Sequence, residues 1–163
     1  MQYLKKASKS PTTGEEDTRR IVQDMLADIE AGGEQKVRDY AKKLDKWTGD
    51  IIVSAETIEA AGASLSQRAR DDIQFAYERV EKFAQAQLES MKEFETELSP
   101  GLVAGQRLIP VGTAGCYIPG GRYAHIASAV MSVTTAKVAG VKHVVACSPT
   151  RGDQGVHPSI LYT

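Results

Sequence analysis

The fold of this chain is decided by residues 114–147, which have the sequence AGCYIPGGRYAHIASAVMSVTTAKVAGVKHVVAC. The apolar run over 114–118 is suited to a buried strand and ends abruptly at a proline followed by a pair of glycines. Small apolar side chains then recur with helical spacing over 126–139, and Gly140 stops that helix. The apolar run over 143–147 predicts a second strand. Strand, loop, helix and strand in this order predict a βαβ unit, the building block of a parallel sheet.

Residues 1–100 are predicted to be mostly helical, with no pattern that points to chemistry. Apolar side chains recur at helical spacing from Glu15 onward, and the pair Gly32-Gly33 is expected to end that helix. A second helix follows the glycine pair. Ser54 can cap a short helix, and the longest helix is expected over about 66–91.

The sequence changes character after Pro100 and Gly101. Short apolar runs at 102–103 and 107–109 predict two strands around a turn at 104–105. This short strand pair is expected to lead into the βαβ unit.

These patterns divide the chain into an N-terminal helical region over 1–100 and the first part of a Rossmann-like nucleotide-binding domain over 101–163. The predicted fold class is α/β, with an N-terminal helical segment followed by the start of a Rossmann-like parallel sheet. A single βαβ unit leaves the faces and edges of its sheet without complete cover. We therefore expect the sequence to be truncated, with the rest of the sheet further along.

Composition limits the class of protein. The 163 residues are 42% hydrophobic and 25% charged with a formal net charge of -1, which is typical of a globular protein with one good core. This balance gives no support for nucleic-acid binding, and no apolar run is long enough to span a bilayer. A cytoplasmic protein without nucleic-acid or membrane partners is the expectation.

The cysteines and two of the histidines have structural explanations. Cys116 and Cys147 are too few for a disulfide framework and lie in apolar runs, where a free cysteine is usually a small hydrophobe. His143 is expected at the surface where a strand begins, and His157 at the entrance of a helix before Pro158. No metal site is predicted from these residues.

The loop after the first strand is the informative segment. Gly120 and Gly121 follow that strand closely, and paired glycines let the backbone approach a bound phosphate or ribose. The next helix has unpaired N–H groups at its N-terminus, which favour an anion. Tyr117 ends the strand, where ligands bind in open α/β sheets, and its ring could stack on a nucleotide. Because the GxGxxG fingerprint is absent, a tight turn with a buried tyrosine is an equally good interpretation.

The amino-acid sequence of this region resembles that of the histidinol dehydrogenase family. In that family a VG..G.Y.PGG loop is followed by an A.VAGV helix end and a strand that leads to SP. The matching residues here are 111–121, 135–141 and 148–149. The segments 28–34 and 39–45 also resemble the family's V..GD.AL..Y...FD opening. The resemblance covers nearly the whole chain, and its loop motif is quite specific.

The resemblance implies an enzyme that oxidises a primary alcohol to a carboxylate in two NAD-dependent steps through an aldehyde. It also implies a zinc ion that orients the substrate hydroxyl, a Glu-His pair that handles protons, and a homodimer with shared active sites. The position matching Tyr117 contacts the nicotinamide cofactor in the family, and Gly120 and Gly121 belong to the same loop. The zinc ligands and the Glu-His pair are expected downstream of Thr163, so we name no catalytic or metal residue.

The segment 123–128 departs from the biosynthetic members of the family. It has Ala127 where they carry a hydroxyl, and it adds His125, so the region looks more like the branch that oxidises dihydroxypropanesulfonate to sulfolactate. Arg122 and His125, at a helix N-terminus, suit an anionic substrate tail better than the cationic amine of histidinol. Arg122 could equally bind a cofactor phosphate or face water, and His125 could cap the helix.

Two alternatives stay open at this point. The first keeps the family but makes the protein an L-histidinol dehydrogenase of histidine biosynthesis. The second belongs to another class, a non-catalytic fragment or a subunit-contact module.

Overall fold

The computed structural model describes residues 13–120 and 123–163. Contacts divide the chain into two compact units, Met1–Thr48 and Gly49–Thr163. None of the helices in the described ranges is long and apolar enough to cross a membrane. The predicted division into a helical region over 1–100 and a nucleotide-binding region over 101–163 stays a prediction.

The described part of the first unit is helical. Helix α1 (Thr13–Tyr40) is interrupted at Gly33, whose φ of 59° and ψ of -149° are not helical, so the predicted break at the glycine pair is confirmed. Beyond the break, Tyr40 donates a hydrogen bond from its hydroxyl to Asp28 Oδ2 at 2.8 Å, which ties the two parts of α1 together. A π-helical turn, Ala41–Asp45, follows directly.

Capped helices begin the second unit. Helix α2 (Ala55–Ser64) starts at Ser54, whose side chain accepts a hydrogen bond from the Thr57 amide at 3.2 Å, so the predicted cap is confirmed. Helix α3 (Gln67–Ser90) starts in the same way at Ser66, within a residue of its predicted start. With 24 residues it is the longest unbroken helix in the described ranges, as expected, because the 28 residues of α1 are interrupted at Gly33.

An antiparallel hairpin follows α3 and corrects the predicted strand positions. Strand β1 (Phe94–Ser99) pairs with β2 (Leu102–Gln106), and the chain turns at Gly101 with a φ of 82°. The predicted turn at 104–105 and the predicted strand at 107–109 are wrong. A glycine at positive φ after Pro100 makes the tight turn there, which leaves 104–105 inside a strand.

The βαβ unit forms as predicted. Strand β3 (Thr113–Tyr117), helix α4 (Ile126–Val138) and strand β4 (His143–Cys147) follow in order, and β3 pairs with β4 in parallel. Gly140, at a φ of 83°, follows the end of α4. The fold class is therefore α/β, with helices first and a Rossmann-like parallel unit after them.

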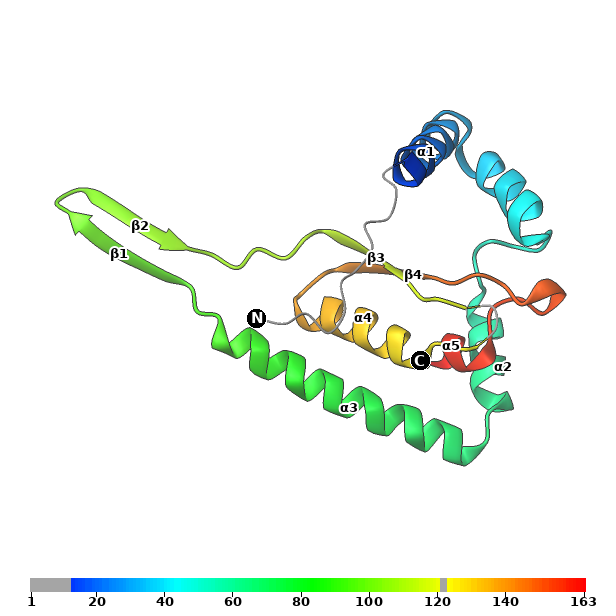
Figure 1. The fold of residues 1–163 in the computed structure, drawn as a ribbon. Coiled ribbons are helices and arrows are strands. Elements are labelled where there is room, and N and C mark those ends of the chain that lie inside the picture. The colour runs from blue at the N-terminus through cyan, green and yellow to red at the C-terminus, as the bar shows by residue number, and fades with distance from the viewer. Residues whose placement is uncertain (1–12, 121–122) are drawn as a thin grey trace, which may run out of the picture. The chain divides into compact units, whose positions relative to one another are not determined.

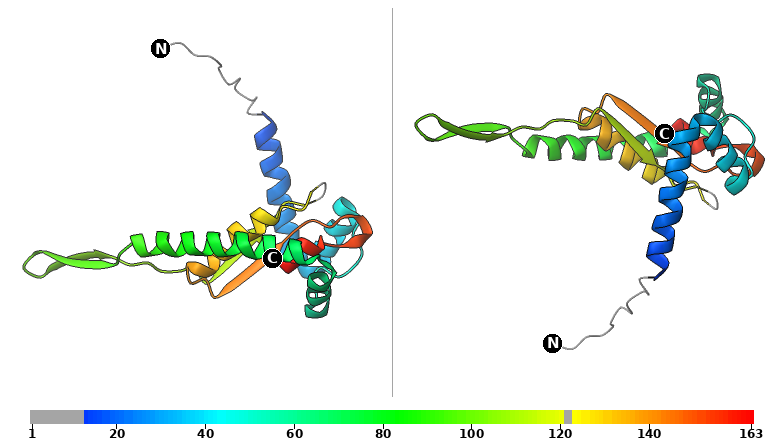
Figure 2. Two further views of the ribbon diagram at one scale, coloured as in Figure 1. Left: turned by 90° about the horizontal axis from the view of Figure 1, so that it is seen from below. Right: turned by 90° about the horizontal axis from the view of Figure 1, so that it is seen from above.

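Helix α4 lies between the parallel strands and α3 (Figure 1). One small core joins the strands to α4 and to the last helix, α5 (Pro158–Tyr162). Its buried members are Cys116, Ile118, Ala129 and Ile160. Figure 2 shows the hairpin extending beyond the end of α3, and every residue of its two strands is exposed. The core of this unit therefore sits around α4 and holds the ends of β3 and β4 in place.

Candidate functional site

The parallel strands end side by side at Tyr117 and Cys147, which are register partners. The Ile118 amide donates a hydrogen bond to the Cys147 carbonyl at 2.8 Å, so the pairing continues one residue past β3. Because parallel strands point the same way, both loops that follow leave from one edge of the sheet (Figure 1). This carboxyl edge is where ligands bind in open α/β folds.

Tyr117 is on the accessible face of this edge. Side chains alternate along a strand, and here Cys116 is only 6% exposed, whereas Tyr117 is 65% exposed. The interpretation of a buried tyrosine is therefore wrong. Cys116 is buried as expected of a small hydrophobe, but Cys147 is exposed because it shares the face of Tyr117.

Gly120 lies where the loop after β3 meets the loop after β4. A Cβ atom at this position would be 3.0 Å from Ser148 Oγ, 3.0 Å from Pro149 Cγ and 3.2 Å from the Pro149 carbonyl oxygen. A side chain here would push the two loops apart, so glycine allows their close approach. Gly121 and Arg122, the next predicted site residues, lie outside the described residues.

Helix α4 starts at the same edge, with His125 as its N-cap residue. The His125 carbonyl accepts hydrogen bonds from the Ser128 amide at 3.0 Å and the Ala129 amide at 3.3 Å. Its side chain is exposed and makes no capping hydrogen bond, so the capping interpretation does not account for the imidazole. The amides at the very start of α4 point out of the helix, where an anion would be favoured.

Two hydroxyls at this edge were missed in the sequence. Within residues 13–120 and 123–163, Ser148 Oγ and Thr150 Oγ1 are buried side-chain oxygens without a hydrogen-bond partner. The sequence pattern marked Ser148-Pro149 only as the end of a strand. Their position directly after β4, at the carboxyl edge, was the signal that could have found them.

The remaining histidines do not form a metal site. His143 is exposed at the opposite end of β4, and the His157 Nδ1 atom accepts a hydrogen bond from the Ser159 amide at 3.1 Å as the cap of α5. Among the described residues, no group of three His, Cys, Asp or Glu side chains is placed to hold a metal ion. The described residues therefore do not by themselves make up the zinc site that the family resemblance implies.

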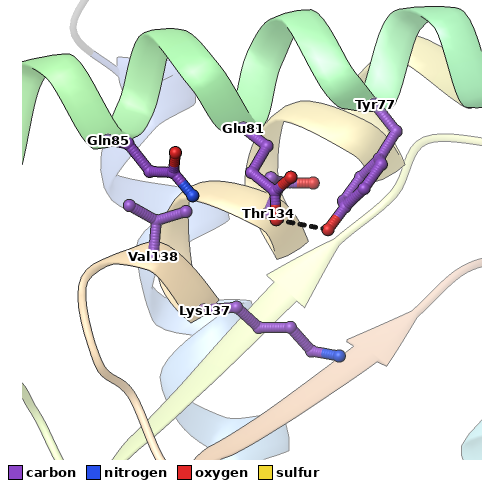
Figure 3. Close-up of a pocket in the computed structure, with 6 residues that line it drawn as sticks. All are labelled: Tyr77, Glu81, Gln85, Thr134, Lys137 and Val138. Carbon is purple, nitrogen blue, oxygen red and sulfur yellow. Dashed lines mark hydrogen bonds between the residues drawn. The ribbon is translucent and has the colours of Figure 1, made fainter.

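A separate pocket lies between α3 and α4 (Figure 3). It has a volume of about 290 Å³ and is lined by Tyr77, Glu81, Gln85, Thr134, Lys137 and Val138. The Tyr77 hydroxyl donates a hydrogen bond to Glu81 Oε1 at 2.5 Å, and this bond raises the pKa of Tyr77 above its ordinary value. Because α3 and the strands pack on α4 from different sides, this pocket is distinct from the carboxyl edge (Figure 1).

Comparison with known proteins agrees with these features. A family model described as histidinol dehydrogenase matches residues 8–163. The chain is 61% identical over 99% of its length to a histidinol dehydrogenase homolog from Pelagibacter ubique, of which it covers 38%. It is 52% identical over 99% of its length to the sulfopropanediol 3-dehydrogenase of Ruegeria pomeroyi, covering 37% of that protein. It is 36% identical over 91% of its length to the histidinol dehydrogenase of Methanosarcina barkeri, covering 34% of that protein.

A solved structure of a histidinol dehydrogenase is also similar to this chain. The histidinol dehydrogenase of Elizabethkingia anophelis superimposes with a TM-score of 0.82 at 30% sequence identity, over 96% of this chain and 35% of that one. The chain thus spans little more than a third of the length of the relatives it matches. On the family match over 8–163 and this structural similarity, the chain belongs to the histidinol dehydrogenase family.

Proposed function

We propose that the protein is an NAD-dependent alcohol dehydrogenase that oxidises 2,3-dihydroxypropane-1-sulfonate to 3-sulfolactate. One observation carries the choice of substrate. The chain is 52% identical to a relative named sulfopropanediol 3-dehydrogenase, but 36% identical to a relative named histidinol dehydrogenase. The histidinol alternative has only the weaker of these two matches in its favour.

The chemistry of the proposal balances in two oxidations. The primary alcohol loses a hydride to one NAD and a proton, which gives an aldehyde. Water adds to the aldehyde, and the hydrate loses a second hydride to a second NAD, which gives the carboxylate. In total, one alcohol, one water and two NAD yield one carboxylate, two NADH and three protons. We assign no step to a zinc ion, because the described residues contain no group of three side chains that could hold a metal ion.

The carboxyl edge of β3 and β4 is the proposed place of the cofactor. The ring of Tyr117 is accessible for stacking on a nicotinamide or adenine ring. Gly120 keeps the two loops close without a side chain between them. Gly121 is proposed to complete this glycine pair, by the resemblance of its motif.

Arg122 and His125 are the proposed contacts of the sulfonate group. The exposed imidazole of His125 makes no capping hydrogen bond to its own helix, and it lies at the N-terminus of α4, where the helix dipole favours an anion. Arg122 is proposed from its position in the sequence alone. The proposal also includes a cytoplasmic homodimer, by resemblance to the family.

The test is oxidation by the full-length, zinc-loaded protein with NAD, in parallel with dihydroxypropanesulfonate and L-histidinol. We expect NADH formation with the sulfonate and none with histidinol. The stoichiometry should approach two NADH for each alcohol consumed. Turnover of histidinol alone would retain the family chemistry and contradict the substrate assignment. Turnover of neither alcohol would remove the proposed activity.

A further inference from the structure

Two buried hydroxyls lie at the carboxyl edge of the parallel strands, in the loop that follows β4. Ser148 Oγ and Thr150 Oγ1 are almost completely closed off from solvent, and neither has a hydrogen-bond partner among the described residues. Buried polar atoms in folded proteins nearly always have a partner. Two exceptions so close together in one loop indicate a partner that comes from outside the described chain.

Other hydroxyls of this chain show how the fold normally satisfies them. One example is Ser64, whose Oγ atom donates a part-buried hydrogen bond to the Ala61 carbonyl at 2.7 Å. Ser148 and Thr150 have no such bond, and Pro149 between them has no N–H to donate. The backbone next to these two hydroxyls therefore provides fewer hydrogen-bond partners than a helix provides for its serines.

The position of these hydroxyls connects them to the glycine loop. A Cβ atom at Gly120 would be 3.0 Å from Ser148 Oγ, so this hydroxyl borders the loop proposed to approach the cofactor. Ser148 and Thr150 are only half-buried as whole residues. Part of each residue is therefore accessible in the loop after β4.

We propose that the Ser148 and Thr150 hydroxyls donate hydrogen bonds to the pyrophosphate of the dinucleotide bound across Gly120. This inference rests on the proposed NAD-dependent function. Hydroxyl groups donate good hydrogen bonds to the charged oxygens of a phosphate. The bound dinucleotide supplies the partners that the two hydroxyls lack in the described chain.

The test uses Ser148→Ala and Thr150→Val in the full-length protein, with NAD and ADP-ribose affinities and the Tm of the ligand-free protein as readouts. We expect each substitution to weaken NAD binding about tenfold, the effect of one hydrogen bond to a charged group. ADP-ribose carries the same pyrophosphate and should lose the same factor. The Tm should stay unchanged or rise, because removing an unpaired buried hydroxyl costs the ligand-free fold nothing.

Ser64→Ala is the matched control, since it removes a bonded serine hydroxyl far along the chain from the carboxyl edge. We expect it to lower Tm and leave NAD affinity unchanged. If Ser148→Ala or Thr150→Val lowers Tm while NAD affinity is retained, the hydroxyls are satisfied inside the fold and the inference is overturned. If the wild type binds NAD and both variants bind it equally well, the inference alone fails. If the wild type does not bind NAD, the proposed function fails.

Discussion

Gly120 has no side chain, and the close approach of two loops at this position requires that. The loops after β3 and β4 approach so closely that a Cβ atom there would meet both the side chain and the backbone of Pro149. Backbone atoms cannot swing aside as the end of a long side chain can, so an added methyl group requires the loops to shift by a few tenths of an ångström. The same close approach brings Ser148 to the loop that contains Gly120. The packing of the two loops and the geometry of the proposed cofactor site therefore both depend on glycine at position 120.

Gly120→Ala should lower the free energy of unfolding by about 1–3 kcal/mol, as expected for overpacking. It should also weaken NAD binding, since the loops at the proposed site are displaced. Chemical denaturation and calorimetric titration of the full-length protein measure the two effects. Gly112→Ala is the control, because a Cβ atom there meets nothing within 4 Å. Equal stability of the two variants would contradict the close approach of the loops.

The hairpin of β1 and β2 requires a glycine at position 105. Gly105 pairs with Glu95, and a Cβ atom at Gly105 would run into the Phe94 carbonyl oxygen of the facing strand. An isolated two-stranded hairpin has little stability to lose, and all of its strand residues are exposed. A local change at Gly105 should therefore open the hairpin without unfolding the rest.

Gly105→Ala should speed amide hydrogen exchange across 94–106 and leave exchange in α4 unchanged. The reason is that the hairpin bonds break locally while the core around α4 keeps its packing. Hydrogen exchange followed by mass spectrometry or NMR measures this. Gly115→Ala serves as the control, since a Cβ atom there meets nothing within 4 Å. Unchanged exchange across 94–106 in Gly105→Ala would contradict the observed register.

The elements that the sequence predicted well are those with local signals. Ser54 and the start of the long helix near Ser66 were found because caps and apolar periodicity act within a few residues. The hairpin was misplaced because Phe94–Ser99 has only two apolar side chains, Phe94 and Leu98, and so gives a weak strand signal. Its partner strand is set by pairing, which a local pattern does not contain. The exposure of Tyr117 and the approach of Gly120 to Ser148 depend on contacts between loops, which no local pattern contains.

At the scale of the whole molecule, the parallel strands lie against α4 on one side only. In the described residues, Tyr117, Val145 and Cys147 are exposed on the other side. Parallel sheets are normally covered on both faces. The relatives extend well beyond the matched region, since the chain covers 38% of its Pelagibacter relative. The chain contains the carboxyl edge of β3 and β4, and the proposed function requires that this edge binds NAD.

Titration of NAD into the full-length protein and its Tyr117→Ala, Tyr117→Phe and His143→Ala variants measures whether the carboxyl edge binds the cofactor. Base–aromatic stacking is worth about 1–3 kcal/mol, so Tyr117→Ala should bind NAD about 5- to 150-fold more weakly. Tyr117→Phe keeps the ring and should stay close to wild type. His143→Ala changes an exposed residue at the opposite end of β4 and should bind NAD normally. NAD binding that is unaffected by Tyr117→Ala would show that the cofactor does not bind at this edge.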